Sequence, residues 1–184
     1  MNDKKYYKRG LYTGAFDSLH IKHIESLKTA SGMCEELIVA VSTDDVIEEY
    51  KHHKPSIPFE QRIAIISELK SVSKAIPQDN LYSKLQMCLE HDVDVLFSCD
   101  EYLKSTYPNP EEMTPKQIAG VERWEKFEQQ LSEYGIDVIY LPRDYSFSST
   151  QQKLDIARSI NYQPEQGIML YSEGECNDEA VFSL

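Results

Sequence analysis

Two histidines form the feature of this sequence with the clearest chemical meaning. His20 and His23 lie three residues apart, where a predicted helix begins after a short loop that starts at Gly14. Residues at this spacing share one face of a helix, and the first turn offers unpaired backbone N–H groups and the positive end of the helix dipole. This combination favours a bound phosphate. The pair also fits two surface histidines or a metal-binding pair.

A second group of cations lies in residues 50–55, which read YKHHKP. Lys51, His53 and Lys54 concentrate positive charge on a chain whose formal net charge is -12. Such a run is usually a solvated loop. Its position just before the predicted helix that contains Arg62 leaves open a second interpretation, in which it contributes to an anion site.

A third group consists of hydroxyl side chains near the end of the strand-and-helix pattern. Ser148, Ser149 and Thr150 precede residues 151–158, whose spacing is helical, and Arg143 lies shortly upstream. Serine and threonine routinely cap helix starts. The same hydroxyls, together with the unpaired N–H groups of the first turn, can bind phosphate, so that both roles can coexist.

The elements that must position these groups alternate between strand and helix. Apolar, β-rich runs predict strands over residues 9–13, 36–42, 74–76, 94–98 and 136–141, and helical spacing or composition predicts helices over 21–31, 59–70, 82–91 and 115–134. This alternation predicts an α/β fold with a Rossmann-like, doubly wound sheet of about five parallel strands flanked by helices. Ligands bind beyond the carboxyl ends of such strands, so that we expect the site in the loops after Thr13, Ser42, Ser98 and Leu141.

The length and patterning of the chain predict one domain. The sequence has 184 residues, of which 41% are hydrophobic, enough for one full core but few for two. We assign residues 1–160 to this domain, with a proline-containing insertion at about residues 102–114. Residues 161–184 are acidic, lack a clear period and are predicted to form a C-terminal tail.

Charge and cysteine usage exclude several classes of protein. A net charge of -12 and a pI near 4.8 argue against a nucleic-acid groove, which needs a basic face. The four cysteines never form a C-x-x-C pair, which argues against a zinc site or a disulfide framework. With no long apolar run and no secretory signal pattern, we expect no membrane span and a cytoplasmic location.

Several segments together resemble the cytidylyltransferase-like nucleotidyltransferases, and within them the glycerol-3-phosphate cytidylyltransferases. Residues 14–23 (GAFDSLHIKH) resemble the G-x-F-D-x-x-H-x-G-H signature of that superfamily. Residues 42–44 resemble its S-T-D, residues 59–62 its aromatic-Glu-x-Arg helix start, and residues 148–150 its S-[ST]-T. The matches cover roughly residues 8–158 in the expected order.

The resemblance implies a role for each group of residues. It implies that His20 and His23 contact a triphosphate and stabilise the transition state, and that Asp17 orients the loop or the ligand. The implied catalytic residues are His20, His23, Lys51 and Arg143. The implied nucleotide-binding residues are Gly14, Ala15, Phe16, Asp17, Asp100, Ser148, Ser149 and Thr150. The implied substrate-binding residues are Arg62, His53 and Lys54.

The resemblance also implies the reaction and the partners. The expected substrates are CTP and a phosphorylated alcohol such as glycerol 3-phosphate, with release of pyrophosphate. Mg²⁺ is expected to accompany the triphosphate, held mainly by phosphate oxygens and water rather than by a dedicated protein metal site. A homodimer is expected because similar enzymes commonly form one.

The sequence departs from the family pattern at a few positions, which keep two alternatives open. Lys22 stands where the family usually has the glycine of H-x-G-H, and Ala15, Ser73 and Ser146 replace the usual threonine, aspartate and glycine. One alternative is an adenylyltransferase of the same superfamily. The other is a nucleotide-binding protein whose catalysis is impaired by Lys22.

Overall fold

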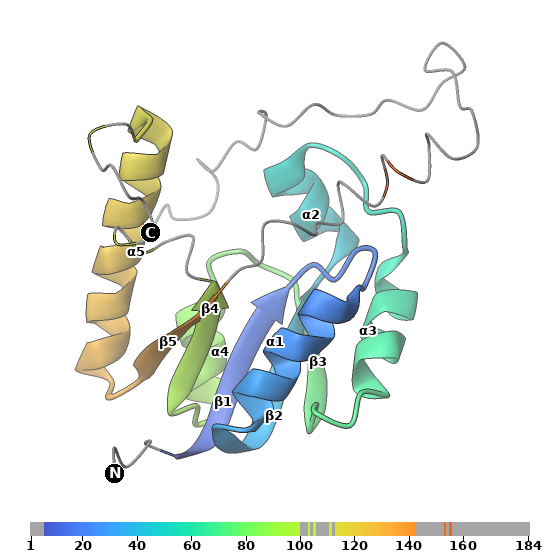
Figure 1. Cartoon of the computed structure of the whole chain (residues 1–184), viewed down its shortest axis with the longest axis horizontal. Coiled ribbons are helices and arrows are strands. Elements are labelled where there is room, and N and C mark those ends of the chain that lie inside the picture. The colour runs from blue at the N-terminus through green and yellow to red at the C-terminus, as the bar shows by residue number, and fades with distance from the viewer. Residues whose placement is uncertain are drawn as a thin grey trace.

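A single parallel sheet organises the described part of the chain. The computed structural model describes residues 6–99, 103, 105, 111, 113–142, 153 and 155. The strands are β1 (Tyr7–Gly14), β2 (Cys34–Ser42), β3 (Lys74–Gln78), β4 (Val95–Cys99) and β5 (Asp137–Leu141). They are arranged in the order β3-β2-β1-β4-β5, and every neighbouring pair is parallel (Figure 1). This confirms the predicted α/β sheet of five parallel strands.

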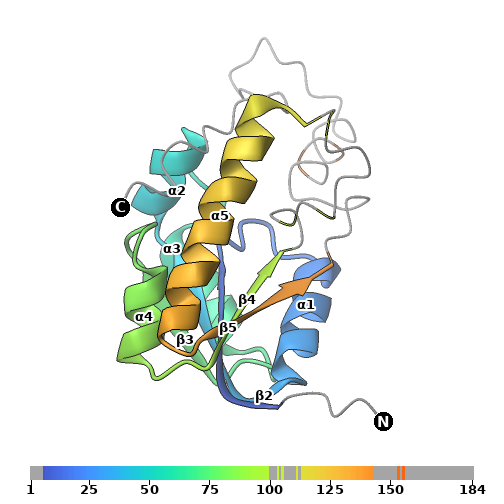
Figure 2. The ribbon, with the colours of Figure 1, turned by 90° about the vertical axis from the view of Figure 1, so that its left-hand side faces the viewer.

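In the described part of the chain, five helices of defined extent connect and cover the strands. They are α1 (Ile21–Ser31), α2 (Asp44–Lys51), α3 (Phe59–Ser67), α4 (Lys84–Glu90) and α5 (Pro115–Glu133). Helices α1 and α3 pack on one face of the sheet, whereas α4 and α5 pack on the other. Figure 2 shows α5 and α1 on opposite sides of the strands. The described elements therefore form three layers, as in doubly wound folds.

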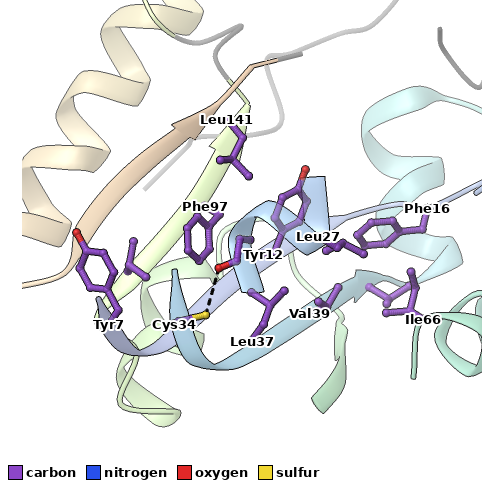
Figure 3. Packing of buried hydrophobic residues seen from close by; sticks show 13 residues of the cluster. Tyr7, Tyr12, Phe16, Leu27, Cys34, Leu37, Val39, Ile66, Phe97 and Leu141 are labelled. Carbon is purple, nitrogen blue, oxygen red and sulfur yellow. Dashed lines mark hydrogen bonds between the residues drawn. The ribbon is translucent and has the colours of Figure 1, made fainter. Parts of the chain in front are cut away.

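From Leu37 onward, β2 is buried on both faces, which explains its continuous apolar sequence. In β2, Leu37 and Val39 belong to the core beneath α1 and α3, while Ile38 and Ala40 belong to the core beneath α4 and α5. Successive strand side chains point to opposite faces, so that a strand covered on both sides must be apolar at every position. Figure 3 shows the first of these cores, where Phe97 of β4 lies among side chains of β1, β2 and α1.

The structure contains one helix that the sequence analysis missed. Helix α2 follows β2 directly, with Thr43 at its N-cap position, acidic residues in its first turn and Lys51 as its last residue. It ends because His52 adopts a left-handed conformation with φ of 56°. Both views place α2 at the end of the sheet to which the strand arrows point (Figures 1 and 2).

Two of the predicted features lie largely or wholly outside the described residues. The insertion at 102–114 is described only at positions 103, 105, 111, 113 and 114, and the tail at 161–184 is not described. Within the described residues, no helix combines the length and the apolar character that a membrane crossing requires.

Candidate active site

A cavity opens where the first four strands end. Its lining includes Gly14 of β1, Ser42 of β2, Gln78 of β3 and Ser98 of β4. This is the edge at which the sequence analysis expected a ligand, because β1 lies at the point where the strand order reverses. The volume is about 160 Å³, below the roughly 300 Å³ at which pockets for drug-sized ligands begin. The enclosed part therefore fits a small group rather than a whole nucleotide.

The loop from β1 to α1 leads from this cavity to the two histidines. Phe16 is buried, and it turns the chain sharply with a φ of 52°. Its ring packs against the α-carbon of Gly14, where an added Cβ would lie 2.9 Å from the ring. Gly14 thus has no side chain because Phe16 occupies the space.

His20 and His23 lie against each other at the start of α1. His20 is the N-cap residue, and the two rings stack with their centroids 3.8 Å apart at an interplanar angle of 26°. The ring of Phe16 meets His23 edge-on at 5.5 Å. The structure therefore brings the two predicted catalytic histidines together on one face. Neither belongs to the cavity lining, so that the candidate site has two adjoining parts, the helix start and the cavity.

Hydrogen bonding and burial define the chemistry of the pair. The backbone N–H of His20 donates to Nδ1 of His23 at 3.3 Å, which assigns the proton of a neutral His23 ring to Nε2. Nε2 is then a donor for an anion. Burial lowers the pKa of His20, because desolvation disfavours the charged imidazolium. A phosphate at the helix start would oppose that effect.

Asp17 is a buried carboxylate at the centre of the site, with 6% of its surface exposed. Oδ1 accepts the backbone N–H groups of Ser56 at 2.9 Å and Ile57 at 3.1 Å, and Oδ2 accepts a hydrogen bond from Nζ of Lys153 at 2.5 Å. Burial alone would raise the pKa of Asp17, but the bond from Lys153 and the two backbone N–H groups outweigh it and lower the pKa. The Asp17 carboxylate is therefore an anion, stabilised by two backbone N–H groups and by the ammonium of Lys153.

Arg62 does not lie where a substrate-binding residue would be expected. Its side chain is fully buried. Nε donates to the carbonyl of Ile57 at 2.8 Å, and Nη1 donates to the carbonyls of Ala15 and Ser42 at 2.5 and 2.7 Å. Nη2 contacts Oδ1 of Asp44 at 2.6 Å. The guanidinium is thus enclosed by protein acceptors and has no exposed surface from which to bind a substrate.

The predicted cations of residues 51–54 lie at the end of α2 and just beyond it. The ammonium of Lys51 lies 5.4 Å from the ring centroid of Tyr50, which lines the cavity. Nδ1 of His53 lies 2.9 Å from the carbonyl of Lys54. Tyr50 is the residue of this stretch that lines the cavity, and Lys51, His53 and Lys54 follow it at the end of α2 without belonging to the lining.

Lys84 is a candidate that the sequence analysis missed. It is the first residue of α4, lines the cavity and donates to the carbonyl of Leu81 at 3.4 Å. Burial lowers its pKa to about 8, an effect that Cys88 partly opposes. In the sequence it is one of many lysines. The signal that could have identified it is its place just beyond the third predicted strand, at the edge where ligands bind.

Lys22, the main departure from the family pattern, points along the surface of α1. Its Nζ pairs with Oε2 of Glu25 at 3.0 Å, and both side chains are partly exposed. The lysine stem therefore runs along the helix toward its next turn. The Cβ remains at the second helical position, between the two histidines in sequence.

Several predicted residues lie outside the described part of the chain. They are Asp100, Arg143, Ser148, Ser149 and Thr150. Lys153, which follows this last group, is described, and its contact with Asp17 joins it to the β1–α1 loop. Among the described residues, no three His, Cys, Asp or Glu side chains gather into a group able to hold a metal ion.

Comparisons with known proteins show the family to which the chain belongs. The cytidylyltransferase-like family model matches residues 11–154, which include both histidines and all five strands except the start of β1. The chain is 30% identical over 151 residues to a glycerol-3-phosphate cytidylyltransferase of Bacillus subtilis (strain 168), a match that covers 82% of this chain and 98% of the relative. A glycerol-3-phosphate cytidylyltransferase of Bacillus spizizenii is 29% identical over 150 residues, with the same coverage.

A solved structure supports the fold independently. The lipopolysaccharide core biosynthesis protein from Thermoplasma volcanium GSS1 superposes with a TM-score of 0.54 at 24% identity. The match covers 74% of this chain and 96% of that protein. At this level of identity, the likeness concerns the arrangement of strands and helices.

Proposed function

This chain belongs to the cytidylyltransferase-like family, and on that premise we propose that it transfers CMP from CTP to a phosphorylated alcohol. Glycerol 3-phosphate or a close analogue is the proposed acceptor, as the names of the two Bacillus relatives suggest. The observation that carries the proposal is the stacked pair of His20 and His23 at the start of α1, beside a cavity that contains the buried amine of Lys84.

The proposed reaction is an in-line displacement at phosphorus. An oxygen of the acceptor phosphate forms a bond to the α-phosphorus of CTP, while the bond from that phosphorus to the oxygen that bridges to the β-phosphate breaks. Pyrophosphate leaves with the bonding electron pair. A phosphate monoester has a second pKa near 6, so that the nucleophile is already ionised at neutral pH. The protein therefore needs no general base and contributes positioning and positive charge.

We assign these tasks to separate parts of the site. Nε2 of His23 and the ring of His20 donate to oxygens of the triphosphate, whose charge increases as the leaving bond breaks. Lys84 holds the acceptor phosphate in the cavity, because its buried ammonium gains most from a dianion nearby. Lys51 and Lys54, with His53 between them, are proposed to supply further donors for the phosphates from the end of α2.

Mg²⁺ is proposed to enter with the triphosphate. The ion would be held mainly by phosphate oxygens and water. When bound, the ion neutralises phosphate charge. The histidine donors would add to that stabilisation and orient the triphosphate.

The decisive experiment follows pyrophosphate release. The protein is incubated with Mg²⁺, each of the four ribonucleoside triphosphates and a panel of phosphorylated alcohols, and the product is identified by mass. Release that requires both CTP and an alcohol phosphate supports the proposal. Release with ATP but not CTP would make the chain an adenylyltransferase. If none of the four triphosphates gave pyrophosphate, the chain would be a nucleotide-binding protein without catalysis. The double variant His20→Ala/His23→Ala, purified identically, controls for contaminating activity.

Two further expectations stay predictions. A homodimer is tested by light scattering coupled to size-exclusion chromatography. A cytoplasmic location is tested by fractionating cells that carry a tagged copy.

A further inference from the structure

Asp17 and Arg62, two buried residues of opposite charge, hold the same short stretch of backbone. Oδ1 of Asp17 accepts the N–H of Ile57 at 3.1 Å, and Nε of Arg62 donates to the C=O of Ile57 at 2.8 Å. Asp17 is 6% exposed and Arg62 is 1% exposed. The backbone of Ile57 is therefore fixed at both its donor and its acceptor.

Arg62 also holds the start of the segment that ends at Ile57. Its Nη2 contacts Asp44, the first residue of α2, at 2.6 Å, while its Nε holds Ile57. The first and last residues of the segment 44–57 thus both contact the Arg62 guanidinium. Lys51 and Lys54 lie within this closed segment, and we call residues 51–54 of it (KHHK) the basic segment.

The same two side chains align the basic segment with the histidines. Nη1 of Arg62 donates to the carbonyl of Ala15 at 2.5 Å, and Asp17 itself precedes His20 by three residues in the same loop. Asp17 joins the β1–α1 loop directly to Ser56 and Ile57, while Arg62 of α3 contacts both the loop and the ends of residues 44–57. Because these contacts are partly buried and charge-assisted, they are stronger than ordinary loop hydrogen bonds.

An apolar anchor would not serve the same purpose. The stretch before α3 has no strand neighbour, so that the N–H groups of Ser56 and Ile57 and the C=O of Ile57 take side chains as partners in partly buried hydrogen bonds. A carboxylate supplies the acceptor and a guanidinium the donors. Removal of Asp17 takes the acceptor from two N–H groups and the counter-ion from Lys153, and removal of Arg62 takes the donors from three carbonyls and the counter-ion from Asp44.

We propose that Asp17 and Arg62 are a pair of positioning residues that hold Lys51 and Lys54 at a set distance from the histidine pair, so that cations from both sides meet one triphosphate. This inference rests on the proposed function for the identity of the ligand. The positioning itself is a property of the loops and can be tested without any nucleotide.

The first test is cleavage by trypsin within the basic segment. Of its two lysines, Lys54 precedes Pro55 and resists cleavage, so that the bond after Lys51 reports on the segment. We expect Asp17→Ala to be cut there several-fold faster than wild type while circular dichroism remains native. Asp17→Asn, which keeps an oxygen acceptor for the two N–H groups, should be cut at nearly the wild-type rate. Arg62→Lys, which introduces no new cleavage residue type, should also be cut faster.

The matched control is Asp94→Ala. Asp94 lies just before β4, at the opposite end of the strands, and its carboxylate accepts the backbone N–H of Arg9 at 2.8 Å. Its loss should destabilise the fold without removing a contact of the basic segment. Equal cleavage after Lys51 in Asp94→Ala and Asp17→Ala, compared at equal stability, would overturn the proposal. If Asp17→Ala does not fold, the comparison of Arg62→Lys with Asp94→Ala decides in the same way.

The second test is a double-mutant cycle read by calorimetry with inorganic pyrophosphate and Mg²⁺. Asp17→Ala should weaken binding about tenfold in the wild-type background and hardly at all in Lys51→Ala/Lys54→Ala, since coupled residues are not additive. Additive losses would contradict positioning. If wild type binds no pyrophosphate, the proposed function fails, whereas the trypsin comparison still decides whether Asp17 and Arg62 hold the segment.

Discussion

The rings of His20 and His23 stack 3.8 Å apart at the start of α1, and the backbone N–H of the first donates to Nδ1 of the second. Two imidazolium cations at such a distance repel each other unless an anion lies beside both. The pair therefore responds to phosphate and to pH together.

The first prediction concerns stability against pH. Burial holds the pKa of folded His20 below its ordinary value of 6.5. Below pH 6.5 the unfolded chain takes up a proton at His20 before the folded chain does, so that the contribution of this residue is complete above pH 6.5 and is lost as pH falls toward the folded pKa. Urea unfolding between pH 5 and 8 should show a smaller loss in His20→Gln than in wild type. Identical profiles would contradict it.

The second prediction concerns catalysis. His20→Ala and His23→Ala should each lower kcat by on the order of a hundredfold, since one preorganised donor typically contributes about 3 kcal/mol to transition-state stabilisation. KM for the triphosphate should change much less. His91→Ala, at the opposite edge of the sheet, is the matched control. A double variant with kcat within a few-fold of wild type would place the site elsewhere.

The third prediction concerns Lys22. Because its ammonium pairs with Glu25 rather than filling the site, Lys22→Gly should keep or modestly improve the affinity for CTP with Mg²⁺. It should lower stability by up to about 1 kcal/mol through the helix propensity of glycine, a cost that Lys28→Gly in the same helix calibrates. Lys22→Glu should weaken binding through repulsion. Loss of CTP binding in Lys22→Gly, measured calorimetrically, would make Lys22 a phosphate ligand.

The fourth prediction concerns Lys84. Its folded pKa of about 8 lies below the ordinary 10.5, so that the stability it contributes is present above pH 10.5 and is lost as pH falls through 8. Lys84→Met should therefore be more stable than wild type at pH 7, while its binding of glycerol 3-phosphate weakens.

Two measurements check the Lys84 prediction. Thermal unfolding at pH 7 and pH 10 should show the gain mainly at the lower pH. Trp124, the single tryptophan of the chain, lines the same cavity, so that its fluorescence reports acceptor binding directly. A Lys84→Met protein that is less stable at pH 7 and binds the acceptor normally would show that the cavity has another role.

The five strands and four of the five described helices could be predicted from the sequence, because strand and helix patterns are set by residues close together in the chain. Helix α1 begins and ends where the spacing predicted, and the continuous apolar run of β2 could only be a strand covered on both faces. The sequence analysis missed helix α2 because it has only eight residues, and its two buried residues, Val46 and Ile47, are adjacent and so show no helical spacing. Its acidic first turn after Thr43 was the available clue.

The site was predictable only where residues are close in the chain. His20 and His23 are neighbours on one helix turn, and their contact follows from their spacing. The place of Arg62 depends on contacts with Ala15, Ser42 and Asp44, up to 47 residues away. No pattern along the chain marks such an arginine as buried, because most arginines are exposed.

The central place of β1 has a consequence for how the chain folds. β1 is made first, yet one of its two neighbours is β4, where Gly10 pairs with Val95. Asp17 meets Lys153 across 136 residues. Contacts between residues so far apart in the chain make folding slow. During synthesis, Asp17 can pair with Lys153 only after nearly the whole described chain has left the ribosome. The histidine site is thus encoded early in the chain and completed late.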